Sequence, residues 1–404
     1  MKRTKVQEEI YRMRFEDVYG KYQKRKLTTE EAADILGISV RTFLRKRQRY
    51  EDDSFDGRFD LRLGKASPHR AADREVAFIT QLYAERYRGF SVKHFHEFAV
   101  REHGVKRSYS WTKNTLETKG LIRKGKKRGG LHRQRRERRP MRGMMLHQDG
   151  STHAWIPGLD HTLDLIVTMD DATSKITSAF LTLEEGTVST FQGLQETIES
   201  EGVFCSLYTD RGSHYFFTPE AGGKVAKGHL TQVGRALKQL GIKHMPAYSP
   251  EARGRSERMF GTLQDRLPKE LALHKITSIA EANRYIKEVY LPRHNEQFSV
   301  KPSSPESAYT PWAGRGLGDI LCIQEERTVG MDNTVSYKKL TLQIPKNEMR
   351  HHYVKTKVDV HEYPDGGLKI YYGPLCLGRY DVEGRFISEE ESAKGPATER
   401  QDIA

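Results

Sequence analysis

Apolar residues recur at different spacings along the chain, and the spacing divides it into three regions. Between residues 27 and 122 they return every three or four positions, which predicts amphipathic helices. From about residue 144, apolar runs of strand length come first and then alternate with helical periods, which predicts an α/β region with a mixed sheet. After about residue 320 the runs alternate around turn residues such as PDGG, which predicts a small β-barrel.

Residues 27–50 are typical of a helix-turn-helix. Thr28 and Glu31 have the spacing of a capping box, and Gly37 permits a turn before a second helix. The alternative is an ordinary helical hairpin with a solvated face; the agreement of spacing and charge favours DNA binding. The side chains expected to contact DNA lie on the exposed side of the second helix: Arg41, Thr42, Arg45, Lys46 and Arg49.

Residues 69–122 predict three more helices, one opened by Ser91 and one ending at Gly120. A second helix-turn-helix or winged-helix module fits this pattern. Three histidines in this region raise the possibility of a metal site, but with no cysteine nearby, packing or surface roles are favoured: His94, His96 and His103.

Residues 123–142 form a strongly basic run. Eleven of the twenty are Lys or Arg and only Glu137 is acidic, so the run cannot pack a core and predicts a flexible linker. The alternative is a solvated spacer, but such a charge density also lies readily along a phosphate backbone. We expect DNA contacts from this linker, including Arg133, Arg135 and Arg136.

Composition agrees with a polyanionic partner. The 404-residue chain carries a formal net charge of +14. Its three cysteines include no CxxC pair, which argues against a disulfide framework and a cysteine-based zinc site. The first residues lack a secretory signal, and no apolar run approaches the roughly 20 residues that span a bilayer. We therefore expect a soluble, intracellular protein in a reducing compartment.

Three acidic residues stand out by their placement. Asp149 comes late in the first predicted strand, Asp210 follows the short strand FCSLYT, and Glu257 is expected in the first turn of a helix after SPEARGRS. Functional groups in open α/β sheets gather at strand ends and at helix starts beside them. Three converging carboxylates would repel one another without a cation, and hard oxygen ligands select Mg²⁺ or Mn²⁺. Two such ions suit phosphodiester cleavage or strand transfer.

Each acidic residue also has a simpler interpretation. Asp149 could cap a turn before Gly150, Asp210 could form an Asx turn, and Glu257 could pair with the helix dipole. Taken together, in this order and setting, the three favour a shared site.

The central region resembles the DDE transposase and retroviral integrase superfamily, which has a ribonuclease-H-like core. The resemblance rests on Asp149 in the first strand, on TDRGSHYF (209–216) and on PEARGRSER (250–258). TMDDATSK (168–175) is similar to a turn of that family, and LPRHNEQFSVKPSSPESAY loosely resembles the segment that follows its core. The bacterial ISNCY group of insertion-sequence transposases is the most similar in domain order. The resemblance implies that Asp149, Asp210 and Glu257 bind two Mg²⁺ (or Mn²⁺) ions.

Two departures accompany this resemblance. The separation of 47 positions from Asp210 to Glu257 is longer than in many family members. The Gly-rich segment 216–229 can hold the additional residues as a loop. Gln264 stands where many members carry Lys or Arg, so we assign it no role in DNA binding. His147 could touch the substrate, but packing is an equally good interpretation. DNA contacts are expected instead from Arg253, Arg255 and Arg258.

These observations predict a DNA transposase that acts on terminal inverted repeats and target DNA as a homo-oligomer. The alternatives are a nuclease of the same fold without strand transfer and a non-catalytic DNA-binding regulator derived from a transposase. The predicted domains are a helix-turn-helix domain at 1–64, a second helical domain at 65–122, a basic linker at 123–142, a catalytic core at 143–312, a β-barrel at 320–388 and a disordered tail at 389–404.

Overall fold

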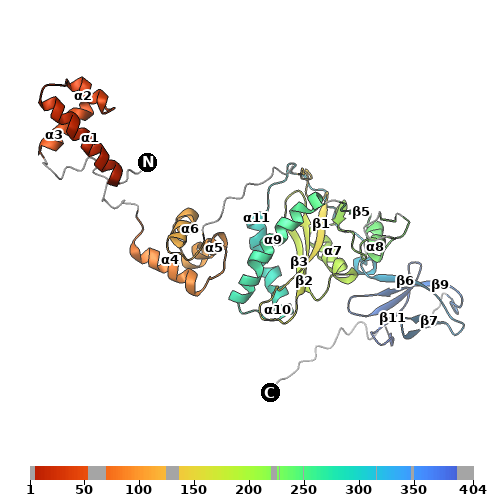
Figure 1. Cartoon of the computed structure of the whole chain (residues 1–404). Helices are drawn as coiled ribbons and strands as arrows, with labels where there is room; N and C mark the ends of the chain where they lie inside the picture. Colours follow the sequence, from red (N-terminus) through yellow and green to blue (C-terminus); the bar gives the residue numbers. More distant parts are fainter. Residues whose placement is uncertain are drawn as a thin grey trace, which may run out of the picture. The chain divides into compact units, whose positions relative to one another are not determined.

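The computed structural model describes most of the chain in two compact units (Figure 1). The units are Met1–Gln81 and Leu82–Ala404. Within the described residues, no helix is both long enough and apolar enough to cross a membrane. The described segments are 5–52, 70–123, 136–219, 225–226, 228–248, 250–314, 316–346 and 350–388. The predicted tail therefore lies outside them, and the boundaries of the six predicted segments stay predictions.

Three helices build the first part of the N-terminal unit: α1 (Lys5–Gln23), α2 (Thr29–Ile35) and α3 (Val40–Asp52). The predicted capping box is confirmed, because the Thr28 side chain accepts from the Glu31 N–H and Glu31 accepts from the Thr28 N–H. Gly37 takes a positive φ of 65° in the turn between α2 and α3. The helices share one apolar core: Phe15, Val18, Tyr19, Ala32, Ala33, Leu36 and Phe43.

The next three helices are α4 (Asp73–Glu85), α5 (Val92–His103) and α6 (Tyr109–Thr118). The boundary between the two units falls within α4. Ser91 stands at the N-cap of α5 as predicted, and Gly104 ends that helix in the left-handed conformation. α5 buries His94, Phe95, Phe98 and Ala99, so His94 has the packing role that was expected.

The centre of the second unit is a five-stranded mixed sheet with the order β3-β2-β1-β4-β5 (Figure 1). β1 pairs antiparallel with β2 and parallel with β4, and β4 pairs parallel with β5. The predicted mixed sheet is therefore confirmed. Its strands are β1 (Leu146–His153), β2 (Leu163–Asp170), β3 (Ile176–Thr182), β4 (Ser206–Thr209) and β5 (Lys243–Pro246).

Helices cover both faces of this sheet. On one face α7 (Thr187–Glu201) and α8 (Gln232–Gln239) bury an apolar cluster that includes Leu146, Leu194 and Leu237. On the other face α9 (Pro250–Leu273), α10 (Ile279–Tyr285) and the π-helical segment Ile286–Tyr290 pack against β2 and β3. α11 (Leu291–Phe298) continues that segment, and a short α12 (Leu317–Ile320) follows.

α9 begins earlier than the sequence suggested. The structure starts it at Pro250, a residue well suited to the first helical position. Glu251 and Glu257 therefore both lie in the helix, whereas Glu257 had been expected in the first turn and Glu251 in a loop. The helical spacing of Phe260, Leu263 and Leu267 predicts one apolar face, and this is confirmed, since all three are buried.

The C-terminal region forms a five-stranded antiparallel sheet and a separate hairpin. The sheet has the order β12-β11-β10-β9-β6, the hairpin pairs β7 with β8, and all share a core around Val360 and Ile370. Within the described residues the pairings do not close, so the predicted barrel is not confirmed. The strands are β6 (Ile323–Thr328), β7 (Thr334–Tyr337), β8 (Leu340–Gln343), β9 (Lys357–Glu362), β10 (Leu368–Tyr372), β11 (Leu375–Tyr380) and β12 (Phe386–Ile387).

Candidate active site

Asp149 and Asp210 stand at neighbouring positions of two parallel strands. Leu146 pairs with Leu207 and His147 with Tyr208, so the same register carried on by two residues brings Asp149 opposite Asp210. Asp149 is 9% exposed. Asp210 directly follows β4, and its Oδ1 accepts a hydrogen bond of 2.8 Å from the Gly212 N–H. The structure thus brings together the first two of the three predicted carboxylates.

A third carboxylate, which sequence reasoning missed, lies at the same edge. Glu185 precedes α7, and its carboxylate packs against Gly150, the residue after Asp149. A side chain at Gly150 would overlap Glu185 Oε2. His214 Nε2 lies 3.6 Å from Glu185 Oε1. Glu185 sits in the polar loop after β3, where nothing local marks it as different from Glu184. Only the packing of that loop beside β1 singles it out.

The pKa of the buried Tyr215 hydroxyl is affected by the negative charge at this edge. Burial raises the pKa of Tyr215 well above its usual range, and the negative charges of Glu185, Asp149 and Asp210 raise it further. Tyr215, in the segment after Asp210, is therefore close enough for all three carboxylates to raise the pKa of its hydroxyl. This arrangement concentrates negative charge around the middle of β1 and the end of β4.

Asp171 is a second residue that sequence reasoning did not select, although it lies in the DDAT turn after β2. Its carboxylate is fully buried and pairs with Arg136 and Arg255. It also accepts hydrogen bonds of 2.8 Å from His147 Nε2 and from the Arg139 N–H. Burial alone would raise the pKa of Asp171, but the hydrogen bonds from His147 and Arg139 outweigh it and hold the pKa well below its usual range.

Asp171 connects three segments around the acidic edge. His147 is two residues before Asp149 on β1, Arg255 is two residues before Glu257 on α9, and Arg136 and Arg139 belong to the predicted linker. The end of that linker is therefore held on the core, while residues 124–135, with Arg133 and Arg135, lie outside the described residues. His147 has the packing role, since it is 3% exposed and bonded to Asp171.

Glu257 is exposed on α9. The described residues contain no group of three or more His, Cys, Asp or Glu arranged to hold a metal ion. Asp149 and Asp210 nevertheless supply adjacent hard oxygen ligands, which suit Mg²⁺ or Mn²⁺. The pair fits such an ion, and the third predicted ligand stays a prediction. Gln264 contacts the same strand, because its Nε2 donates to Ser151 Oγ at 3.0 Å.

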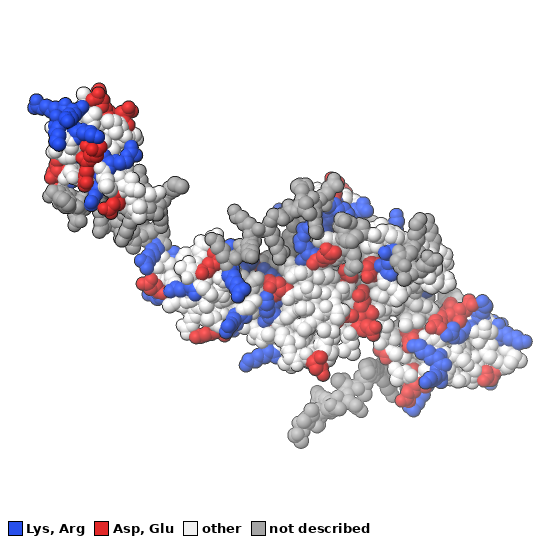
Figure 2. Space-filling model, in the orientation of Figure 1, with Lys and Arg blue, Asp and Glu red and all other residues white. Residues whose placement is uncertain are grey.

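The predicted DNA-contacting side chains differ in their surroundings. Arg41, Arg45 and Arg49 are exposed on α3, and Figure 2 shows Lys and Arg gathered at one end of the N-terminal unit. Lys46 donates to Tyr11 Oη at 2.7 Å, and Thr42 Oγ1 lies 2.8 Å from Ser39 Oγ. Arg258 is exposed, Arg136 and Arg255 pair with Asp171, and the side chain of Arg253 lies outside the description.

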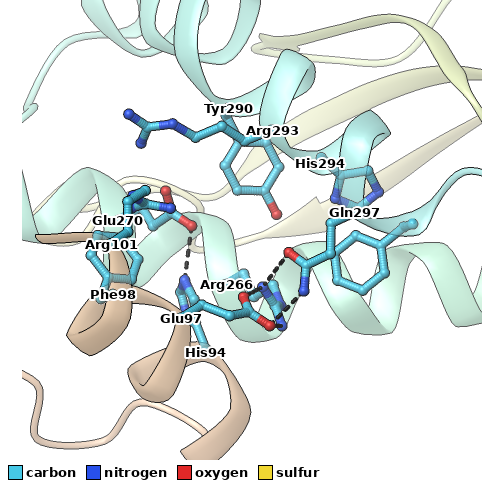
Figure 3. A pocket seen from close by; sticks show the side chains of 11 residues that line it. His94, Glu97, Phe98, Arg101, Arg266, Glu270, Tyr290, Arg293, His294 and Gln297 are labelled. Atoms are coloured by element: carbon cyan, nitrogen blue, oxygen red, sulfur yellow. Dashed lines mark hydrogen bonds and ion pairs between the residues drawn. The ribbon is translucent and has the colours of Figure 1, made fainter. Parts of the chain in front are cut away.

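The other half of α9 is joined to α5 by buried polar contacts (Figure 3). His94 Nε2 lies 2.8 Å from Glu270 Oε1, and Tyr285 donates to Glu270 Oε2 at 2.8 Å. In Figure 3 the carboxylate of Glu97 lies between Arg266 and Gln297, and its Oε2 accepts from Arg266 Nη1 at 2.6 Å. We call these side chains the α5–α9 seam: His94, Glu97, Arg266, Glu270, Tyr285 and Gln297.

The charges in the α5–α9 seam are compensated within the protein. Burial alone would raise the pKa of Glu270, but the hydrogen bonds from His94 and Tyr285 outweigh it and lower the pKa. Burial also lowers the pKa of His294, beside the α5–α9 seam, to about 4. The α5 helix and the core are thus joined by paired groups of low exposure.

Comparison with known proteins identifies the family. A putative transposase, y4bF of Sinorhizobium fredii, is 31% identical over 359 residues, which cover 88% of this chain and 77% of that protein. The transposase for insertion sequence IS1202 of Streptococcus pneumoniae is 27% identical, over 91% of this chain and 87% of that protein. No family model matches the chain.

Solved structures give weaker likenesses. The HTLV-2 integrase catalytic core domain in complex with magnesium, in its dimeric form, is 16% identical, with 37% of this chain and 89% of that chain covered and a TM-score of 0.28. A chain of the simian T-cell lymphotropic virus intasome in complex with PP2A regulatory subunit B56 gamma is 15% identical, with 77% and 99% covered and a TM-score of 0.33. The relationship to the curated transposases carries the assignment: this chain belongs to the transposases.

Proposed function

We propose that this transposase binds the terminal inverted repeats of an insertion sequence and catalyses Mg²⁺-dependent DNA cleavage and strand transfer. The observation that supports the proposal is the parallel register of β1 and β4, which brings Asp149 within β1 opposite Asp210 just after β4, in a chain of the transposase family. The sequence context of Glu257 adds the third carboxylate.

Asp149, Asp210 and Glu257 would hold two divalent ions. When bound, such ions polarise a phosphodiester and lower the pKa of a water molecule. The chain's own residues fix the ligands: the Gly212 N–H orients Asp210, and Asp171 ties Arg255 to β1 through His147. These contacts of Asp171 limit how far the start of α9 can move from β1. Glu257 on α9 has to approach Asp149 on β1 to share an ion with it.

The basic helical modules would recognise the DNA ends. The exposed arginines of α3 suit the major groove, and the linker arginines suit phosphates. Arg136 and Arg255 already pair with Asp171, so a contact between either side chain and DNA would have to share or replace that pair. We propose that a homo-oligomer assembles on double-stranded DNA, because both ends of an element have to be processed together.

A joined-product assay tests this function. Duplexes that carry the inverted repeat flanking the gene are incubated with the protein and Mg²⁺, and cleaved and joined products are resolved separately. We expect both products from the wild type and neither from Asp210→Asn. Cleavage without joining would favour the nuclease, and binding without cleavage in any divalent metal would favour the regulator. Equal products from both proteins would show that Asp210 is not catalytic.

A further inference from the structure

A pocket of about 430 Å³ lies beside the Asp210 segment, on the side of β5 and α8. Its lining includes Tyr215 and Phe216 from the segment after Asp210, Lys238 from α8, and His244 and Tyr248 from β5 and the loop that follows. Tyr248 lies two residues before α9 begins. The lining therefore includes part of the segment that follows Asp210 and part of the segment that precedes α9 and Glu257.

The interior of the pocket offers flat, uncharged rings. Phe216 and His244 are stacked, with ring centroids 3.9 Å apart and an interplanar angle of 18°. Burial lowers the pKa of His244 to about 4, so the imidazole is neutral near pH 7. Leu230 and Ile242 add aliphatic surface. Such a lining suits a planar, uncharged group more than an anion.

The edge of the pocket has a different character. Tyr248 is 59% exposed, which is high for a tyrosine beside a pocket. The guanidinium of Arg211, the residue after Asp210, lies 5.3 Å from the centre of the Tyr248 ring. Lys238 contributes a second cation to the lining. An exposed aromatic ring with a cation beside it is the combination that proteins use to stack a base and hold its phosphate.

Size and position narrow the occupant further. The volume of this pocket falls within the range of about 300–1,000 Å³ of pockets that bind small organic ligands. A single nucleobase is a small organic group, so it fits a pocket at the lower end of that range. Arg211, the residue after Asp210, lies against the Tyr248 ring at the edge of this pocket. A DNA strand held at Asp210 would therefore run beside the pocket. Enzymes that act on a paired strand gain access by unstacking nucleotides and stacking them on aromatic side chains.

We propose that this pocket receives one unpaired nucleobase of the DNA end, stacked on Tyr248, with Arg211 and Lys238 facing its phosphate. The inference rests on the proposed transposase function, because it needs DNA to be held at Asp210. It assigns Tyr248 a role in positioning the strand and gives it no part in the chemical step.

A binding cycle between protein and DNA tests this proposal without catalysis. A duplex carrying the inverted repeat is made with a single abasic site at each terminal position in turn. Its affinity is measured by fluorescence anisotropy without divalent metal, for the wild type, Tyr248→Phe and Tyr248→Ala. Tyr372→Ala is the matched control, since Tyr372 is 41% exposed on the C-terminal sheet.

One abasic position is expected to weaken binding by the wild type and by Tyr248→Phe roughly tenfold, which is the size of one lost stacking contact. The same position should cost Tyr248→Ala little further affinity, because the stacking partner has already been removed. Tyr372→Ala should respond as the wild type does. The proposal is overturned if, at every position, the abasic site weakens binding by Tyr248→Ala as much as it weakens binding by the wild type. It is also overturned if Tyr372→Ala is as insensitive to the abasic site as Tyr248→Ala.

The proposed function is scored separately on the same proteins. If the wild type neither prefers the inverted repeat nor cleaves it in Mg²⁺, the transposase function fails. If the wild type cleaves the repeat and no position couples to Tyr248, only the pocket assignment fails.

Discussion

Carboxylates around α9 and carboxylates at the edge of the central sheet lie in different surroundings. In the second half, Glu270 is buried and accepts from His94 and Tyr285, and near the start of the helix Arg255 pairs with buried Asp171. At the sheet edge, Asp149, Asp210 and Glu185 instead act together on the single hydroxyl of Tyr215. Carboxylates that have a cation or donors from the protein around them stabilise the fold. Carboxylates that also bear on one another at a sheet edge are suited to a divalent ion from solution.

The largest expected effect separates the two glutamates at the start of α9. Glu257→Gln should lower the rate of Mg²⁺-dependent cleavage by about a thousandfold or more, since loss of a metal ligand removes several kcal/mol of transition-state stabilisation. Glu251→Gln is the matched control on the same helix and should keep full activity. Rates are measured on inverted-repeat duplexes under single-turnover conditions. Full activity in Glu257→Gln with loss in Glu251→Gln would reverse the assignment.

Asp171 should matter first for stability. Asp171→Ala leaves Arg255 and His147 without their shared partner and is expected to lower the free energy of unfolding by about 3 kcal/mol. Urea unfolding measures this change. Asp160→Ala, at a carboxylate that is 98% exposed and contacts only the neighbouring His161 among the described pairs, should change stability little. Equal effects in the two variants would show that the Asp171 cluster does not hold β1 and α9 together.

The α5–α9 seam should contribute somewhat less. Glu270→Ala removes the acceptor for His94 and Tyr285 and is expected to cost about 2 kcal/mol, the range of hydrogen bonds to a charged group. Combined with His94→Phe, the loss should be smaller than the sum of the two single losses, because the variants share one contact. Strict additivity in urea unfolding would contradict the contact between the α5 helix and the core.

Acid should weaken the fold through buried histidines. Burial lowers the pKa of His294 and of His361 to about 4, so the unfolded chain binds protons first as the pH falls below about 6.5. Each group then costs about 1.4 kcal/mol of stability per pH unit until the pH reaches about 4. Unfolding free energies at pH 7.0, 6.0 and 5.0 measure the slope. His294→Phe should make it shallower, and an unchanged slope would contradict the role of His294.

The lowered pKa values of Asp171 and Glu270 act in a lower range of pH. Their contribution is fully present above the pKa of an unfolded carboxyl group, near 4, and is lost as the pH falls toward the folded values. The histidine effect should therefore appear at higher pH than the carboxylate effect. Loss of stability confined to pH below 4 would mean that the histidines are not the first groups to titrate.

Local signals allowed much of the fold to be predicted. The capping box at Thr28, the N-cap at Ser91 and the apolar face of Phe260 and Leu263 depend on residues within one or two turns, and the structure confirms them. The strand order of the sheet needed the parallel pairing of β1 with β4, which joins residues about 60 positions apart. The early start of α9 was missed because Gly254 looked like a boundary, although it lies inside the helix.

The candidate site could be predicted only in part for the same reason. Asp149 lies in a strand and Asp210 follows one within a motif, so their sequence neighbours mark them. Glu185 and Asp171 gain their surroundings from segments far along the chain, so the sequence alone does not separate them from other acidic residues. The DDAT turn was noticed, but the pairing of Asp171 with Arg255 is a tertiary contact.

Calorimetric titration with Mn²⁺ tests most directly whether the sheet edge holds the ions. Wild-type protein on inverted-repeat DNA should bind Mn²⁺, and Asp149→Asn/Asp210→Asn should lose that binding while it still unfolds cooperatively and still binds DNA. Asp160→Asn, at a carboxylate that is 98% exposed, should bind Mn²⁺ as the wild type does. Unchanged Mn²⁺ binding in the Asp149→Asn/Asp210→Asn protein would contradict the assignment of the metal site to this edge.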